Sequence, residues 1–495
     1  MHPPLRLELW RSVSMKRFIF SLFMMLALSI CAYGDSFWVN SETGNDSSPG
    51  TQLEPLKTIK QALARIGILG GTIYTEGTFY NGLKISKTKY PAGQPLIVDG
   101  QEKTLFYGFE GPYDPETFDP LKMPNRTYGI PTIMDCHNVV FKNFTTWGGQ
   151  MDALALDDSY PDIGLRHITL DNINVRYGRK RGIFMGGHNI QYINIYNCTV
   201  TETVYGDVTH GIYLTGGAWT NKSIYGPVKY IDIRNTKVTL SGGRHGLQLN
   251  GRFEFVNIEG CEFANNQLCG ISLIGCRWVF IHDNLIWGNN KQGIVIYDDK
   301  HDWYPPSMTE EQWLAAHHAN GLIFIYQNTI FIGPHAWMHD PYHWNIPDNQ
   351  PCILVNNKVN SDLFPNRYHN LKISIYDNVM ASPWPSMIQF WHSQEALVTL
   401  VHGNLMWTYH KDKKSPIVSI YGYGDFTVES LQNNPKCKPW YSNNIIADPE
   451  FAFKPEYDYI NLNEPPYEFD FSNFYSYADL YSYIAKRLGK GKIFH

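Results

Sequence analysis

The stretches YINIYNCTV (residues 192–200) and YIDIRNTKV (230–238) decide the fold. In both, apolar and polar residues alternate up to an asparagine, and the apolar character then returns. Alternation with a period of two predicts a β-strand, and asparagine tolerates the left-handed backbone of a tight corner. Six more stretches follow the same pattern, with glycine in place of asparagine in the one at Phe255, and they begin at Asn138, His167, Phe255, Val279, Leu322 and Lys372.

A second series of apolar stretches lies between these units. RGIFMGG (181–187), HGIYLTG (210–216) and HGLQLNG (245–251) represent it, and the other members begin at Asp152, Cys269 and Gln292. Successive members start 23 to 35 residues apart, which is close to one turn of a coiled β-solenoid with variable loops. A β-sandwich, the main competing architecture, does not explain a corner that recurs in register.

The asparagines that end the first series recur at one position of the repeat. We expect them to stack as a ladder inside the coil. The predicted ladder comprises Asn143, Asn172, Asn197, Asn235, Asn284, Asn328 and Asn378.

Composition restricts the class of function. With 43% hydrophobic and 18% charged residues, the 495-residue chain can bury a large core. Its formal net charge of -5 argues against a general nucleic-acid or membrane-surface binder, which needs a large positive field. We therefore expect no nucleic-acid partner, and any basic site must be local.

The N-terminal region resembles an export signal. From Met15 the chain reads MKRFIFSLFMMLALSICAYGD, with two positive residues, an apolar run and a small-x-small cleavage pattern. Residues 1–34 are thus predicted to be a signal peptide that starts at Met15, and the protein to be secreted or periplasmic. No later apolar run reaches the roughly 18 residues of a membrane span.

Both ends of the predicted coil resemble a known group. FWVNSETGNDSSPGTQLEPLKTIKQAL (37–63) is similar to the opening segment of secreted bacterial right-handed β-helix proteins, and NNIIADPEFAFKPEYDYINL (443–462) to their closing coil. The resemblance implies an all-β, pectate-lyase-like, single-stranded right-handed parallel β-helix over residues 35–465. A loop or helix insert is expected near 300–350, and a partly helical extension at 466–495.

Function in such a coil has to lie on an outer face or in loops, because inward side chains fill the interior. By alternation, Tyr213 and Gln248 point outward. Strict alternation would turn His210 and His245 inward, but the glycine after each permits a bulge that turns them out. Since coils lie about 4.8 Å apart, we expect one basic-imidazole patch. It comprises Lys180, Arg181, His210, Arg244 and His245.

A motif sharpens this expectation. YGDVTHG (205–211) is similar to the Tyr-Gly-x-Asp-Pro-His motif of mannuronan C-5 epimerases, although one residue is missing and threonine replaces proline. RHG at Arg244 is similar to the arginine-histidine pair of a later coil in those enzymes. The resemblance implies these site residues: Tyr205, Asp207, His210, Arg244 and His245.

The patch suits an acidic polysaccharide, and we expect a β-eliminating lyase. His210 or His245 would act as base, Tyr205 as proton donor, and Arg244, Lys180 and Arg181 would bind the uronate carboxylate. Tyr213, Gln248, Asp157 and Asp158 are expected to contact substrate. A C-5 epimerase shares the proton abstraction and stays open.

Two other functions also stay open. A glycoside hydrolase would use two carboxylates, drawn from Asp152, Asp157, Asp158 and Asp207. A non-catalytic protein would only bind glycans on the wall that carries Phe184 and Tyr213. The sequence identifies no cofactor with certainty. Asp157 and Asp158 could hold Ca²⁺, and the metal ligands are left unknown.

Overall fold

The computed structural model describes most of the predicted coil. The described residues are 35–80, 82–108, 130–149, 151–159, 163–203, 209–216, 219–220, 223–224, 227–297, 322–332, 350–356, 372–382, 384–391, 399–408, 415–420, 424–435 and 437–449. The predicted leader, most of the predicted insert and the predicted C-terminal extension lie outside these residues, so their boundaries stay predictions.

Strand pairing arranges the described strands in three parallel sheets, which we name A, B and C. Sheet A contains β1 (Asp35–Asn40), β4 (Leu96–Asp99), β11 (Ile190–Tyr196), β16 (Val228–Arg234), β23 (Leu322–Tyr326), β26 (Lys372–Tyr376), β29 (Thr399–His402), β33 (Tyr441–Ser442) and the first parts of β2 (Gly71–Phe79), β7 (His137–Trp147) and β9 (Leu165–Arg176). The second parts of β18 (Leu247–Glu259) and β20 (Ile271–His282) complete sheet A.

Sheet B contains the second parts of β2, β7 and β9 with β5 (Thr104–Tyr107), β12 (Thr199–Thr203), β17 (Lys237–Ser241), β19 (Glu262–Ala264), β21 (Leu285–Trp287), β24 (Thr329–Phe331), β27 (Val379–Ser382), β30 (Leu405–Thr408) and β34 (Ile445–Ile446). Sheet C contains β3 (Leu83–Ser86), β6 (Pro131–Met134), β8 (Asp152–Asp157), β10 (Arg181–Gly187), β13 (His210–Gly216), the first parts of β18 and β20, β22 (Ile294–Tyr297), β25 (Ile353–Asn356), β28 (Ser386–Phe390) and β31 (Ile417–Ile420).

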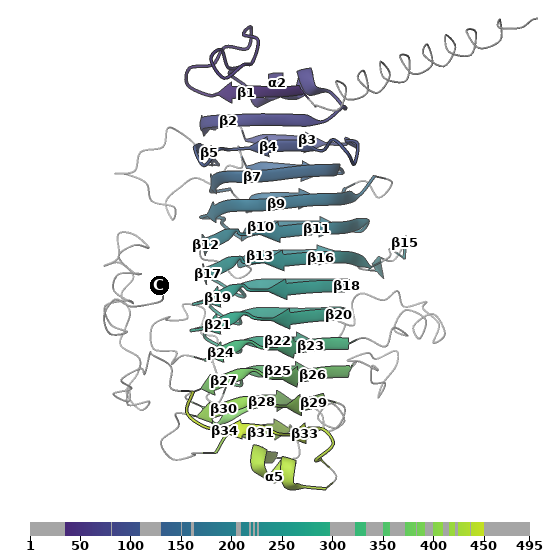
Figure 1. Cartoon of the computed structure of the whole chain (residues 1–495), viewed down its shortest axis with the longest axis vertical. Coiled ribbons are helices and arrows are strands. Elements are labelled where there is room, and N and C mark those ends of the chain that lie inside the picture. Colours follow the sequence, from purple (N-terminus) through teal and green to yellow (C-terminus); the bar gives the residue numbers. More distant parts are fainter. Residues whose placement is uncertain are drawn as a thin grey trace, which may run out of the picture.

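The chain passes from sheet C to sheet A to sheet B and then begins the next coil, so the coils stack along one long axis (Figure 1). Helix α2 (Ile59–Ile66) lies at the N-terminal end, where its buried residues join the coil core. At the other end, β32 (Gly424–Thr427) pairs antiparallel with β31, and helix α5 (Val428–Asn433) follows. A short hairpin joins β14 (Trp219–Thr220) and β15 (Ser223–Ile224). The predicted all-β parallel coil is confirmed.

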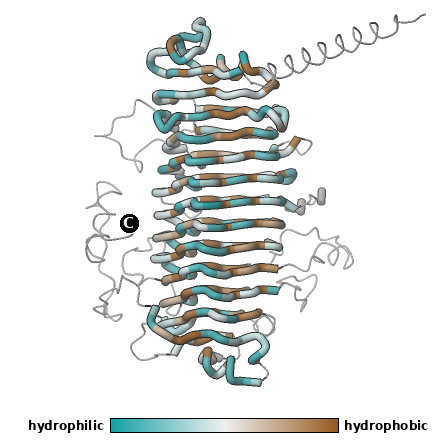
Figure 2. Tube along the Cα trace, in the orientation of Figure 1, coloured by the Kyte–Doolittle hydropathy of each residue, from teal (hydrophilic) through white to brown (hydrophobic). Residues whose placement is uncertain are grey.

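Alternation along the strands builds the core. In β11, Ile193 and Ile195 are buried in the coil, whereas Asn194 between them faces outward and is only partly buried. Ile193 lies in register with Ile231 of the next coil, so identical side chains stack. Burial of each isoleucine side chain stabilises the folded state by about 1.5–3 kcal/mol relative to an exposed side chain. Hydrophobic and hydrophilic residues consequently mix along the whole length of the stack (Figure 2).

A buried asparagine ladder occupies the corner between sheets A and B in the later coils. The side-chain amide of Asn284 donates to Oδ1 of Asn328 at 2.9 Å, and Asn328 donates in the same way to Asn378 at 2.9 Å. The ladder continues through Asn404 to Asn444. The asparagine side chains form hydrogen bonds with one another and with the backbone of the corner, so these buried amide groups have hydrogen-bond partners.

The predicted ladder was wrong for its first four members. These residues precede the inward position and adopt the left-handed conformation, with φ between 49° and 58°: Asn143, Asn172, Asn197 and Asn235. The inward position of the same coils is filled by Phe144, Ile173, Cys198 and Thr236. Asparagine therefore has two uses at this corner, one conformational and one as a buried hydrogen-bonding group.

We predict that Asn328→Ala lowers the free energy of unfolding by about 3 kcal/mol, because buried donors and acceptors lose their partner. Asn328 also donates to the carbonyl oxygens of Ile281 and Tyr326. Chemical denaturation measures the change. Asn197→Ala, at an exposed corner, is the control, with an expected loss of about 1 kcal/mol. Equal losses in the two variants would contradict a structural role for the ladder.

Candidate functional site

Polar residues gather where the chain enters sheet C. Arg181 of β10 lies in register with Asp152 of β8 on one side and with His210 of β13 on the other. His245 follows on the next coil, where its carbonyl accepts from the N–H of Gly211 at 3.1 Å. Four consecutive coils therefore place a charged or imidazole side chain at the same position. We call these residues, Asp152, Arg181, His210 and His245, the column.

The glycines at this corner decide which way the histidines point. A Cβ atom on Gly211 would lie 2.3 Å from Cγ1 of Val238, a core residue, and the equivalent position at Gly182 is as crowded. The glycine position thus faces the core, as does Ile212 directly after it. His210, which precedes the glycine, consequently leaves the coil on its outer side, as the expected bulge required.

The two imidazoles stack outside the coil. The ring centroids of His210 and His245 are 5.6 Å apart with an interplanar angle of 21°, and the His210 ring also stacks on Tyr213 at 4.8 Å. Both histidines are buried. Burial, followed by the charges of His245, Arg244 and Arg181, holds the pKa of His210 well below 6.5. His210 is therefore neutral at neutral pH, as a proton acceptor has to be.

Arg181 and Asp152 form an ion pair at the N-terminal end of the column. Nε of Arg181 donates to Oδ1 of Asp152 at 2.5 Å, and Nη2 donates to Oδ2 at 3.2 Å. The guanidinium carbon lies 3.8 Å from the centroid of the Phe184 ring, which fixes its plane. Burial raises the pKa of Asp152 to about 6, against the lowering effects of Arg181 and Lys180.

Other predicted residues surround this column. Tyr213 and Gln248 lie in register on the outer face of sheet C, with Tyr213 partly exposed and Gln248 buried. Arg244 is partly exposed, and its charge acts on His210. Asn250, which sequence reasoning missed, donates from Nδ2 to the Tyr213 hydroxyl at 2.7 Å. Its outward position on the same strand, two residues after Gln248, was the available signal.

The two aspartates at the C-terminal end of β8, Asp157 and Asp158, differ in their surroundings. Oδ2 of Asp158 accepts from the backbone N–H groups of His188 and Asn189, at 2.9 and 2.6 Å, so this carboxylate binds a corner of the coil. Asp157 is partly exposed and accepts from the Ser159 hydroxyl at 3.0 Å. Among the described residues, no three His, Cys, Asp or Glu side chains gather as metal ligands. Tyr205 and Asp207 lie outside the described residues.

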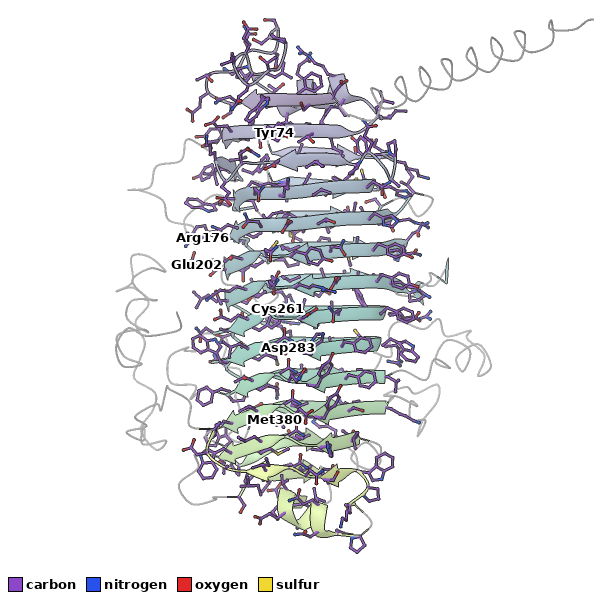
Figure 3. The ribbon with its side chains drawn as sticks, in the orientation of Figure 1. Tyr74, Arg176, Glu202, Cys261, Asp283 and Met380 are labelled. Atoms are coloured by element: carbon purple, nitrogen blue, oxygen red, sulfur yellow. The ribbon has the colours of Figure 1, made fainter. Side chains whose placement is uncertain are left out.

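A second ion pair supports the corner before the site. Arg176, at the end of β9, donates from Nε to Oε2 of the buried Glu202 at 2.8 Å. The two residues lie at the same edge of adjacent coils (Figure 3). The Arg176 guanidinium also lies over the rings of Trp147 and Tyr177. This anchored corner leads directly into the segment that carries Lys180 and Arg181.

Exposed aromatic rings on sheet A do not form a comparable site. Tyr192 and Tyr230 stack with centroids 4.6 Å apart, and Phe255 continues the stack at 5.3 Å. Sugars bind aromatic side chains through the ring face, and these faces cover one another. The outer face of sheet C is therefore the stronger candidate.

Residues 228–304 match the family described as right handed beta helix region. The chain is a right-handed β-helix protein. No curated protein matches this β-helix protein in sequence. None of the helices in the described part of the chain has the length and apolar character of a membrane span.

Several solved structures are similar to the β-helix protein. Pectate lyase Pel9A shows 13% identity and a TM-score of 0.41 over 69% of this chain and 78% of that chain. The GH136 lacto-N-biosidase from Eubacterium ramulus shows 11% identity and a TM-score of 0.40, over 83% and 67%. The A-module of the Azotobacter vinelandii mannuronan C-5 epimerase AlgE6 shows 14% identity and a TM-score of 0.39, over 79% and 93%. These values assign no reaction to the chain.

The depressed pKa of His210 predicts a pH dependence of stability. Below pH 6.5 an unfolded chain protonates this imidazole, whereas the folded chain keeps it neutral. The unfolded state then binds more protons, so the free energy of unfolding falls as the pH drops below 6.5. Denaturation at a series of pH values should show this slope, and the slope should decrease in His210→Gln. An unchanged slope would mean that His210 titrates alike in both states.

Proposed function

We propose that this β-helix protein is a carbohydrate-active enzyme that cleaves an acidic polysaccharide by β-elimination. The observation that carries the proposal is the outward, stacked pair His210 and His245 beside the cationic Arg244. The predicted leader from Met15 would deliver the enzyme to the secreted or periplasmic location where such polymers are met.

The base in this proposal is an imidazole of the pair. It takes the C5 proton of a uronate residue, the C5–H electrons form the C4–C5 double bond, and the C4–O bond breaks. Proton transfer by a positioned group contributes about 10²- to 10⁴-fold in rate. His210 is neutral, so one of its ring nitrogens has a lone pair that can accept the proton.

The uronate carboxylate needs positive charge, because abstraction of the C5 proton places negative charge on it. Arg244 and Lys180 are the proposed partners, both partly exposed next to the column. Arg181 adds charge, but its Nε and Nη2 groups already bind Asp152. We therefore assign Arg181 to positioning. We assign Arg244 to the substrate because it is partly exposed and its charge acts on His210.

The leaving oxygen needs a proton donor. Tyr205 keeps this role as a proposal from sequence. Among the described residues, Tyr213 is the alternative: its oxygen accepts from Asn250, so its own proton can point toward a ligand. Gln248, in register with Tyr213, is proposed to bind sugar hydroxyls.

Incubation with a panel of uronate polymers tests the proposal. Elimination produces a double bond conjugated with the carboxylate, so ultraviolet absorbance should rise with at least one polymer. New reducing ends without absorbance would instead indicate hydrolysis. Deuterium incorporation from heavy water without cleavage would indicate a C-5 epimerase, and binding without any turnover a glycan-binding protein.

Hydrolysis remains a second candidate for one reason. The pKa of Asp152 is raised to about 6, which suits a general acid near neutral pH. Asp157, on the same strand and partly exposed, is the proposed second carboxylate among the described residues. In this case Asp152→Asn and Asp157→Asn should each abolish reducing-end formation, and retained activity in both would remove the candidate.

A further inference from the structure

The outer face of sheet B changes from polar to apolar partway along the stack. One outward position carries polar residues in four successive coils: Asn174, Thr199, Lys237 and Glu262. From β21 onward, four of five coils carry an aliphatic residue at the same position. We call these five residues the apolar strip: Leu285, Thr329, Val379, Leu405 and Ile445. The residue after each of the first four belongs to the coil core, so alternation places the strip outside.

The apolar strip is accessible to solvent. Ile445 is 56% exposed, and the other four members are partly exposed. The partly exposed Trp287 lies on the same face, two residues after Leu285. In the polar coils Lys237 instead pairs with Glu262 at 2.9 Å, as suits side chains that face water. Single exposed apolar side chains are ordinary, but a contiguous row of them marks a surface that binds a partner.

The described chain ends at this face of the coil. The last described strand is β34, which pairs with β30 in sheet B, and its first residue, Ile445, is the last member of the apolar strip. Figure 1 shows β21, β24, β27, β30 and β34 one after another at the same edge of the stack. The strip is therefore about 19 Å long, since adjacent coils lie about 4.8 Å apart. Residues 450–495, which lie outside the described residues, continue the chain from one end of this strip.

The sequence that follows contains a segment with a matching apolar face. ADLYSYIAKRL (478–488) has Leu480, Ile484 and Leu488 at positions i, i+4 and i+8, which predicts an amphipathic helix. A helix of this length extends for about 17 Å, close to the length of the apolar strip. Lys486 and Arg487 give its C-terminal end a positive charge. An amphipathic helix has to bury its apolar face against another element.

We propose that the predicted helix 478–488 docks on the apolar strip of its own chain. The segment is tethered at one end of the strip, which gives it a high effective concentration there. Two exposed carboxylates border the strip at the corner before sheet B, Asp283 and Asp377, two residues ahead of Leu285 and Val379. Asp283 also pairs with Nδ1 of His282 at 2.7 Å. Their negative charge complements the basic end of the helix.

Hydroxyl-radical labelling of the full chain, read by mass spectrometry, tests the docking. Ile484→Asp places a charge on the apolar face of the helix and releases it, so labelling of Leu405 and Trp287 should rise severalfold. Ser482→Asp introduces the same charge on the opposite face of the helix and should leave labelling at the wild-type level. Tyr230 on sheet A is the internal reference and should be labelled equally in all three proteins. Unchanged labelling of the strip in Ile484→Asp would overturn the proposal.

An exchange of charges tests the identity of the occupant separately. Asp283→Lys combined with Asp377→Lys should raise labelling of Leu405, and adding Lys486→Glu and Arg487→Glu should lower it again. Labelling that stays high in the fourfold variant would contradict the proposed pairing of charges. Wild-type labelling that falls as the protein concentration rises, with a dimer in analytical ultracentrifugation, would show that a second copy covers the strip and would also overturn the proposal.

Discussion

Replacing His245 with alanine is expected to lower kcat/KM for elimination by about 10²- to 10⁴-fold, because the variant loses a proton acceptor at the reacting carbon. His210→Ala should have an effect in the same range, since each ring is packed against the other with centroids 5.6 Å apart. Initial rates from the ultraviolet absorbance of the product measure both. The variant with the larger loss identifies the imidazole that takes the proton.

The control for this prediction is another stacked, outward histidine. His282 stacks on Tyr326 at 4.7 Å on sheet A, away from the column, and His282→Ala should leave the rate within twofold. Thermal unfolding of all three variants separates lost activity from lost structure. Rates close to wild type in both His210→Ala and His245→Ala would exclude the pair as the base.

The second large effect is expected for Arg244→Lys, which should reduce kcat/KM about 10- to 100-fold. A lysine keeps the charge but loses the fork of parallel N–H donors that matches a carboxylate. Hydrogen bonds to charged groups are worth about 1.5–3 kcal/mol, and this range sets the expected factor. Steady-state kinetics on the cleaved polymer measures the change.

Arg181→Lys is the matched comparison, because Arg181 already binds Asp152 through two hydrogen bonds. Its main consequence should be a lower stability, with a smaller change in kcat/KM than Arg244→Lys. The opposite order of the two kinetic effects would mean that Arg181, not Arg244, binds the substrate carboxylate.

The fold was predictable because its determinants are local and repeated. The alternation in stretches such as 192–200 and 230–238 specifies a strand and a corner without knowledge of any distant contact. The same locality explains the error in the asparagine ladder. Asn197 and Asn284 look alike in sequence, but one holds the left-handed corner and the other the inward position beside it.

The site was only partly predictable. Its column of residues follows from the repeat, and the direction of His210 follows from the glycine after it once the crowding at that glycine is known. The ion pair between Arg181 and Asp152 depends on side-chain rotamers across two coils, which the sequence does not specify. The neutral state of His210 arises from burial, and that depends on packing outside the coil.

The buried asparagine column also sets how such a molecule changes over evolutionary time. Consecutive members are separated by 44, 50, 26 and 40 residues, yet each amide meets the next with nearly the same geometry. Each asparagine therefore occupies the same position in its coil, whatever the number of residues between it and the asparagine of the next coil. Insertions between two asparagines alter the loops and leave the scaffold intact, so new specificities can arise without a new fold. Deletion of the residues from one asparagine to the next would likewise remove one whole coil, and the asparagines of the two flanking coils could still pair.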